Sequence, residues 1–161
     1  MQEETLDIVN DQDEVIGRAT RKEVYQKRLQ HRIVHVLIFN KQDEMLLQLR
    51  AKTVSFCPLH WSTAVGGHVQ TGESYEEAAD RECVEELGKT TKLEFFSKDR
   101  YQIEGVKKFL VVYKAKTDQV FEAGEEVERI DYFSINKIKE MKNNGEEFHP
   151  ELLFLLEKHF F

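Results

Sequence analysis

The chain has 161 residues, a formal net charge of −7 and a hydrophobic content of 40%. This length suits one domain with a real core, and the acidic balance argues against binding to nucleic acid or anionic membranes, which requires a basic surface. No apolar run approaches the ~20 residues that span a bilayer, and no signal peptide is recognisable. The two cysteines, Cys57 and Cys83, form no CxxC pair. We therefore expect a single cytoplasmic domain over residues 1–161.

The N-terminal part is predicted to form a hairpin followed by a short helix. Two apolar runs, residues 6–9 and 15–19, flank the polar stretch NDQDE. This pattern is typical of two strands joined by a turn, and it predicts a hairpin over residues 4–19. A helix is expected next, over residues 20–27.

The stretch HRIVHVLIFN is predicted to be a central strand. Ile33 and Leu37 lie on one face and Val34 and Val36 on the other, so both faces are apolar and both should be covered. MLLQLR, residues 45–50, is expected to be the following strand. Further strands are expected at residues 93–101, 108–114 and 129–133, and further helices at 74–87, 135–143 and 150–159. This order predicts an α/β fold with a mixed sheet between helices.

The helix predicted at residues 74–87 has clear signals at both ends. Ser74 and Glu77 form a capping box at its start, and Gly88 follows as a C-terminal stop. Apolar residues recur every four positions and should face the core; they are Tyr75, Ala79, Cys83 and Leu87.

Three acidic residues crowd the C-terminal half of this helix. Glu85 and Glu86 follow Glu82 at i+3 and i+4, so all three should project from one face, where the helix dipole disfavours anions. At an effective dielectric of ~20, such neighbours repel by up to ~3 kcal/mol per pair. Arg81 could relieve one glutamate but not three. The sequence therefore favours a bound Mg²⁺ or Mn²⁺ ion over the alternative of an acidic, solvated helix end.

This segment resembles the Nudix box of the Nudix hydrolase superfamily. The pattern lies within residues 67–89 and has the family's spacing of Gly67, Glu73, Arg81, Glu82, Cys83, Glu85, Glu86 and Gly88. One position departs, because Lys89 stands where the family usually has an aliphatic residue. The resemblance implies a Nudix fold, which is an α/β/α sandwich, and cleavage of a diphosphate linked to another group.

The resemblance also implies a metal site. Glu82, Glu85 and Glu86 would ligate the ion, and the backbone carbonyls near Gly66 and Gly67 would help. Divalent ions neutralise phosphate oxygens and lower the pKa of a bound water, so the implied residues suit diphosphate hydrolysis with Glu85 and Glu86 as catalytic groups.

Other residues of the box would have structural roles. Glu73 and Arg81 would brace the loop against the helix, as the resemblance implies. A general base outside the box is expected to be a glutamate, and Glu125 and Glu126 in EAGEEVERIDYF are the candidates, with Glu126 preferred. The alternative for both is an ordinary polar turn before a strand.

A narrower resemblance covers most of the chain and points to the branch related to type 1 isopentenyl-diphosphate isomerase. It rests on LDIVNDQDEVIGRATRKEVY, HRIVHVLIFN, LLQLRAK and HWSTAVGGHVQTGESYEEAADRE. Gly66 stands where the isomerase has its catalytic cysteine, and Val106 and Lys108 stand where two glutamates are expected. Of three metal histidines, His31 and His68 remain, and the third falls near positions 24 and 25. The isomerase acid–base pair is therefore missing, whereas the hydrolase box is intact.

Several other residues are candidates for substrate contacts. Arg50 ends a predicted strand, and its guanidinium fork suits a phosphate group. His31 and His68 are candidates for phosphate contacts, with structural hydrogen bonding as the alternative. Trp61 fits equally a pocket wall or ordinary packing.

The last predicted helix has one apolar stripe for the core, formed by Leu152, Leu155, Leu156 and Phe160. Phe154 and Phe161 fall off that stripe. This arrangement allows a homodimer through the helix.

Together these observations predict a Mg²⁺-dependent (Mn²⁺ is the alternative) Nudix hydrolase that cleaves a diphosphate bond in a nucleoside diphosphate-linked or related small metabolite. One alternative is isopentenyl-diphosphate isomerase. A second alternative is a metabolite-sensing Nudix module without turnover, which the clustered carboxylates disfavour.

Overall fold

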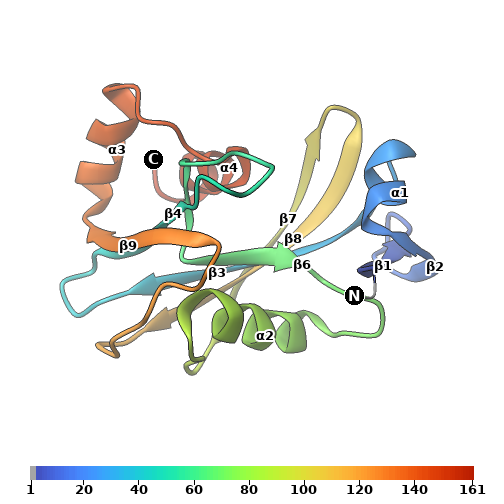
Figure 1. The fold of residues 1–161 in the computed structure, drawn as a ribbon, viewed down its shortest axis with the longest axis horizontal. Coiled ribbons are helices and arrows are strands. Elements are labelled where there is room, and N and C mark those ends of the chain that lie inside the picture. Colours follow the sequence, from blue (N-terminus) through green and yellow to red (C-terminus); the bar gives the residue numbers. More distant parts are fainter. Residues whose placement is uncertain (1–2) are drawn as a thin grey trace.

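The computed structural model describes residues 3–161, so the first two residues of the predicted domain lie outside the described residues. The elements in chain order are β1 (Thr5–Val9), β2 (Val15–Thr20), α1 (Arg21–Gln26), β3 (His31–Phe39), β4 (Met45–Arg50), β5 (Trp61–Thr63), β6 (Val65–His68), α2 (Tyr75–Leu87), β7 (Glu94–Ile103), β8 (Val106–Lys116), β9 (Val127–Phe133), α3 (Ile135–Asn143) and α4 (Pro150–His159). Figure 1 shows α2 below the main sheet and α3 and α4 above it.

The main sheet is mixed, and β3 is its central strand. Its strand order is β5-β4-β3-β8-β7, with β6 also paired to β3 and β9 to β4. β3 runs parallel to β8 along its whole length, but it meets β4 only where Phe39 faces Met45. The other half of β3 pairs with β6 instead. Because β3 pairs with β4 at one end and with β6 over its other half, the two glycines of β6 lie next to the central strand of the sheet.

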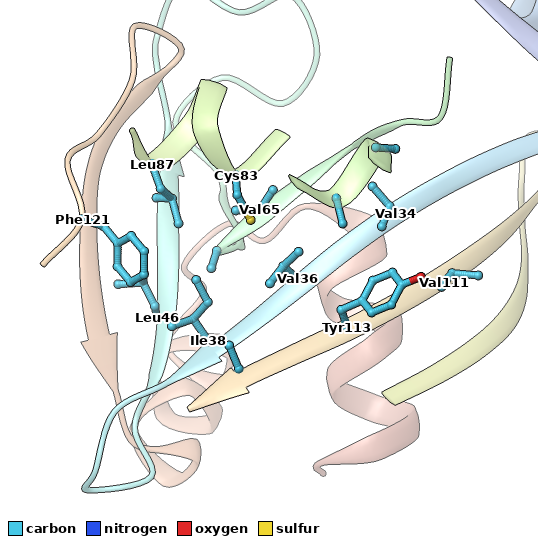
Figure 2. Close-up of a cluster of buried hydrophobic side chains, with 14 of the residues drawn as sticks. Val34, Val36, Ile38, Leu46, Val65, Cys83, Leu87, Val111, Tyr113 and Phe121 are labelled. Carbon is cyan, nitrogen blue, oxygen red and sulfur yellow. The ribbon is translucent and has the colours of Figure 1, made fainter. Parts of the chain in front are cut away.

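The face of the sheet under α2 holds one part of the core. The predicted capping box of Ser74 and Glu77 is present, and Gly88 ends the helix with a left-handed φ of 81°, a conformation that glycine adopts without steric cost. The buried side of α2 packs on β3 and its neighbours (Figure 2), through Ala78, Ala79, Cys83, Leu87, Val34, Val36, Ile38 and Val65.

The opposite face is covered by α3 and α4. Ile33 and Leu37 of β3 pack there against Ile138, Met141, Leu152, Leu155 and Leu156. The predicted layered α/β fold, with a central strand covered on both faces, is thus confirmed. Phe154 and Phe161 are half-buried against this same cluster, and Phe154 packs edge-on against Tyr101 with ring centroids 5.0 Å apart. Both rings contact their own chain, which weakens the basis for the predicted homodimer.

Two strands were not expected from the sequence. β5 has 3 residues and β6 has 4, and β6 contains Gly66 and Gly67. Neither segment has the length or the β-branched content that marks a strand in isolation. Both are held by tertiary pairing, β5 with β4 and β6 with β3. None of the helices within residues 3–161 has the length and apolar character needed to cross a bilayer.

The N-terminal hairpin supports the loop that leads into α2. β1 and β2 form the predicted two-stranded sheet. The Thr71 N–H donates to the Thr5 carbonyl at 2.9 Å, and the Gly72 N–H donates to the Asp7 carboxylate at 3.1 Å. The hairpin therefore fixes the entry of the chain into the helix that carries the acidic residues.

Candidate active site

Glu82 and Glu86 form a pair of inward-facing carboxyl groups on α2. Glu82 is 9% exposed, and its carboxyl group neighbours that of Glu86. Glu86 accepts hydrogen bonds from Gln48 Nε2 at 2.7 Å and from the Gly66 N–H at 3.3 Å. Gln48 also donates to the Ala64 carbonyl at 3.0 Å. The pair is thus held between α2, β4 and β6.

Both carboxyl groups have raised pKa values. Burial raises the pKa of Glu82 to about 7, and Glu85 adds to the rise while Arg81 opposes it. Burial and the neighbouring Glu82 hold the pKa of Glu86 well above its usual range. Arg81 contacts Glu82 at 2.8 Å, but among the described residues no positively charged side chain contacts Glu86, so one charge is left to compensate two adjacent acids. Their oxygen donors, with the backbone of Gly66 beside them, fit a hard divalent cation such as Mg²⁺ or Mn²⁺.

Gly67 makes room for the Glu82 carboxylate. A Cβ atom at position 67 would overlap the carboxyl carbon and both oxygens of Glu82. The glycine is needed here because the helix carboxylate lies directly against the backbone of β6.

Arg81 ties the loop before α2 to the acidic face. It contacts Glu73 at 2.7 and 2.9 Å and donates to the His68 carbonyl at 3.0 Å. It also contacts Glu82 at 2.8 Å and Glu85 at 3.4 Å. Arg81 thus reaches two of the three glutamates, one more than expected, because its planar fork also serves Glu82 and Glu85 beside Glu73. As expected, it does not reach all three, because Glu86 is not among its contacts in the part of the chain that the structure describes.

Glu85 lies apart from the buried pair. Its side chain is 56% exposed and faces Arg81. Within residues 3–161, no group of three or more histidine, cysteine, aspartate or glutamate side chains is gathered in metal-binding geometry. The structure thus brings Glu82 and Glu86 together and places Glu85 at the rim, where an exposed side chain changes rotamer within nanoseconds.

The C-terminus of α2 is covered by the loop over residues 117–126. The Glu122 N–H donates to the Leu87 carbonyl at 3.1 Å, and the Gly124 N–H donates to the Glu86 carbonyl at 2.9 Å. A Cβ atom at Gly124 would overlap the Glu85 carbonyl oxygen. These backbone donors offset part of the negative charge at the helix end. No local signal in the sequence indicates this role for Gly124.

The predicted general bases follow in the same loop. Glu125 and Glu126 are both exposed. The Glu126 carbonyl accepts from the Ala51 N–H at 3.0 Å, which links the loop to the end of β4. The backbone of Glu126 thus links the loop to β4, while its side chain is exposed to solvent.

Arg50 and Trp61 lie on either side of the loop over residues 51–60. Arg50 ends β4, and its Nε donates to the Phe56 carbonyl at 3.0 Å. Trp61 is buried, and its Nε1 donates to Glu146 at 3.2 Å. Trp61 also borders a surface cavity of about 300 Å³, formed with Leu49, Leu59, Arg129 and residues 145–147.

His31 of β3 and His68 of β6 lie together on the face of the sheet opposite α2. Their rings stack with centroids 5.6 Å apart, and the Tyr25 hydroxyl lies 2.6 Å from His68 Nε2. Burial lowers the pKa of His31 to about 4 and that of His68 well below its usual range. Both rings are therefore neutral at pH 7 and offer no positive charge to a phosphate.

A buried ion pair stands at the position where the isomerase resemblance calls for a glutamate. Lys108 Nζ donates to Glu151 Oε2 at 2.8 Å, and His35 Nε2 lies 2.8 Å from Glu151 Oε1. Sequence reasoning missed both His35 and Glu151. The signal was His35 itself, which interrupts the apolar face of β3 between Ile33 and Leu37.

The raised pKa of Glu82 predicts how the stability of the metal-free protein depends on pH. A carboxyl group with a raised folded pKa contributes stability at low pH and loses it as pH rises through the folded value. The free energy of unfolding of the wild type, measured in urea with EDTA, should fall relative to Glu82→Gln between about pH 5 and pH 7, by up to about 1 kcal/mol per pH unit. The difference between the wild type and the variant is used because the buried histidines contribute equally to both. Their lowered pKa values change the free energy of unfolding with pH in the opposite direction. A difference that stays flat or grows with pH would show that Arg81 compensates Glu82 fully.

Comparison with known proteins identifies relatives of this fold and site. A family model described as NUDIX domain matches residues 29–156. The uncharacterized Nudix hydrolase all7351 of Nostoc sp. is 34% identical over 122 residues, which are 71% of this chain and 70% of the relative. An uncharacterized Nudix hydrolase of Yersinia pestis is 38% identical over 85 residues, 53% of this chain and 47% of the relative. The match thus spans about half the length of several curated relatives.

Solved structures share the fold. The crystal structure of DR0079 from Deinococcus radiodurans is 25% identical and superposes with a TM-score of 0.80, covering 98% of this chain and 100% of that one. The NUDIX domain of Shewanella oneidensis NrtR, solved with ADP ribose, has a TM-score of 0.64 at 17% identity. The superposition covers 87% of this chain and 96% of that one. At that identity the likeness concerns the fold alone.

Proposed function

This chain belongs to the NUDIX domain family, and from that premise we propose that it is a Mg²⁺- or Mn²⁺-dependent hydrolase that cleaves a diphosphate bond in a small metabolite. One observation carries the proposal: Glu82 and Glu86 form a buried carboxyl pair beside the backbone of Gly66 and Gly67. Burying two acids in contact costs stability unless a cation compensates them. If the pair served only the fold, uncharged side chains at these two positions would make the protein more stable.

The residues around the pair have separate tasks in this proposal. The bound ion would neutralise phosphate oxygens and lower the pKa of a bound water. Glu82 and Glu86 hold it, Gln48 orients the Glu86 carboxylate, and the exposed Glu85 completes the ligand set by rotating inward. Glu73 and Arg81 keep the loop before α2 in register with the helix through their bidentate contact.

Two further roles are proposed at the rim. Arg50 grips a substrate phosphate with the guanidinium nitrogens that do not contact Phe56, since a guanidinium group has five donors. Glu126 supplies the general base from the loop that covers the end of α2, and a carboxylate there reaches the bound water only if its exposed side chain turns toward the pair.

The substrate class is proposed from the relatives and the site together. The NrtR domain binds ADP ribose, and a nucleoside diphosphate-linked compound is the corresponding substrate for this chain. Isopentenyl-diphosphate isomerisation is disfavoured, because Gly66 has no side chain and the Lys108 amine is engaged by Glu151. A homodimer through α4 stays a prediction.

The test is a panel of diphosphate compounds incubated with the protein in the presence of Mg²⁺ or EDTA. The panel contains nucleoside diphosphate sugars, dinucleotides and isopentenyl diphosphate, and phosphate-containing products are identified by mass spectrometry. We expect Mg²⁺-dependent cleavage of at least one member. A parallel reaction with isopentenyl diphosphate in deuterated water should leave its prenyl carbons free of deuterium. Deuterium in the recovered prenyl group would replace the hydrolase assignment with an isomerase.

A further inference from the structure

One peptide group of β6 connects the carboxyl pair to buried side chains on the opposite face of the sheet. This peptide group joins Val65 to Gly66. Its N–H donates to Glu86 Oε2 at 3.3 Å, and its carbonyl accepts from the Thr63 hydroxyl at 2.8 Å. Because a peptide group is planar, the direction of its carbonyl also sets the direction of its N–H. The contact made by Thr63 therefore affects the position of the Glu86 carboxylate.

Thr63 is itself held by a series of buried polar side chains. Its hydroxyl lies 2.8 Å from His35 Nδ1, and His35 Nε2 lies 2.8 Å from Glu151 Oε1. Lys108 Nζ donates to the other oxygen of Glu151 at 2.8 Å. We call these four side chains the buried network, and each of them is at most 6% exposed. They come from β5, β3, α4 and β8, so the network links four elements to the peptide group beside Glu86.

Gly66 is in direct contact with this buried network. A Cβ atom at position 66 would lie 2.9 Å from His35 Nδ1 and 3.3 Å from the Thr63 hydroxyl oxygen. Glycine at this position therefore allows both side chains to approach the backbone closely. The backbone at Gly66 is thus held on one face of the sheet by the network and on the other by Glu86.

The two oxygens of Glu86 depend on different contacts. Gln48 Nε2 donates to Glu86 Oε1 at 2.7 Å and is itself tied to the Ala64 carbonyl at 3.0 Å. Oε2 accepts from the Gly66 N–H. The direction of the carboxylate plane is therefore set by Gln48 at one oxygen and, at the other, by the peptide group that Thr63 holds.

A buried network of this kind is more than docking of one helix requires. The pair of Glu151 and Lys108 alone joins α4 to β8. Burying such ion pairs often stabilises a fold no more than apolar side chains of similar volume would. Hydrogen bonds that are all satisfied do, however, fix the direction of the groups that they join. His35 and Thr63 extend these directional contacts to β6, where direction matters for a metal ligand.

We propose that Thr63 is a positioning residue for the metal site, and that the buried network fixes the peptide group before Gly66 so that Glu86 points at the ion. The inference rests on the proposed function and adds to it residues from the opposite face of the sheet. Thr63 acts through Gly66 and Glu86 and is not a ligand itself. Removing a group that orients a metal ligand typically lowers metal affinity or activity by about 10–100-fold.

Two substitutions of Thr63 separate its hydroxyl from its shape. Valine keeps the shape and removes the hydroxyl, whereas serine keeps the hydroxyl and removes a methyl group. Mn²⁺ affinity is measured by calorimetric titration of the metal-free protein, and kcat and KM are measured with any compound of the panel that is cleaved. We expect Thr63→Val to weaken Mn²⁺ binding about 10-fold and to lower kcat by a similar factor, with KM unchanged. Thr63→Ser should stay within about 3-fold of the wild type in both.

His35→Gln tests the next link in the buried network. Glutamine places an amide near the Nε2 position, where it contacts Glu151, and has no group near the Nδ1 position for Thr63. We expect this variant to weaken Mn²⁺ binding by about 3-fold or more, so the inference is tested even if Thr63→Val does not fold. Wild-type Mn²⁺ affinity in His35→Gln would contradict it.

Ser134→Ala is the control for loss of stability alone. Ser134 caps α3 by accepting from the Lys137 N–H at 3.1 Å. Loss of a cap destabilises a helix, so the melting temperature in EDTA should fall for Ser134→Ala as well as for Thr63→Val. Mn²⁺ affinity and kcat should fall for Thr63→Val and stay at the wild-type level for Ser134→Ala.

Three results would overturn the inference. One is equal Mn²⁺ affinity of Thr63→Val and the wild type, even if the variant is less stable. Another is a loss of affinity that Thr63→Ser shares, because the methyl group rather than the hydroxyl would then matter. The third is absence of Mn²⁺ binding by the wild type. If Mn²⁺ binds and Thr63 changes its affinity as expected but no diphosphate compound is cleaved, the hydrolase proposal fails while this inference stands.

Discussion

Replacing Glu86 by glutamine is expected to abolish Mg²⁺-dependent cleavage while leaving the metal-free protein at least as stable as the wild type. Glutamine keeps an oxygen that can accept from Gln48 and Gly66, which lie 2.7 and 3.3 Å from Glu86. It removes the charge that a divalent ion requires, so we expect a loss of about 10³-fold or more in kcat. It also removes a buried carboxyl group whose pKa is raised by burial and by the neighbouring Glu82.

The measurement pairs steady-state kinetics with thermal unfolding in EDTA and in Mg²⁺. Mg²⁺ should raise the melting temperature of the wild type, by linkage to the folded state, and should do so much less for the variant. Glu76→Gln is the control, because Glu76 is exposed in the first turn of the same helix. If Glu86→Gln unfolds at a markedly lower temperature in EDTA, the carboxylate stabilises the fold and the metal proposal loses its basis.

Gly67→Ala is expected to lower activity about 100-fold with little loss of stability. The new Cβ atom would overlap the Glu82 carboxyl group, which is the end of a flexible side chain rather than backbone. The carboxylate therefore moves and the strand stays, so the metal loses one ligand in position. The apparent Mg²⁺ affinity should fall together with kcat.

Gly17→Ala is the control for this experiment, because it makes the same substitution at a glycine where the added Cβ atom meets no neighbour. Among the described residues, nothing lies within 4 Å of a Cβ atom built at Gly17. Its activity and Mg²⁺ affinity should equal those of the wild type. Full activity in Gly67→Ala would show that Glu82 does not need its position beside β6, and unfolding of Gly67→Ala would show that the strand cannot adjust.

The sequence predicts those parts of the fold that depend on local signals. The capping box of Ser74 and Glu77 and the stop at Gly88 place α2 to within a residue, because cap chemistry acts over one helical turn. The alternating apolar residues of β3 likewise predict its central position, since burial on both faces requires apolar side chains on both.

The features that the sequence does not reveal depend on contacts between distant segments. Gly124 covers the end of α2 from a loop, and Glu151 reaches His35 and Lys108 across the sheet. Helical spacing alone put Glu85 with Glu82 and Glu86, but Arg81 draws it outward. Side-chain direction at a helix end is decided by its neighbours as well as by its position in the turn.

The central claim is that Glu82 and Glu86 together hold a divalent ion, and calorimetric titration of the metal-free protein with Mn²⁺ tests it most directly. Run at pH 7 in two buffers with different ionisation enthalpies, the titration reports both binding and protons released. Because burial raises the pKa of Glu82 to about 7 and holds that of Glu86 well above its usual range, we predict that binding releases protons and that Glu86→Gln binds far more weakly. Equal Mn²⁺ binding by the wild type and Glu86→Gln, without proton release, would contradict the claim.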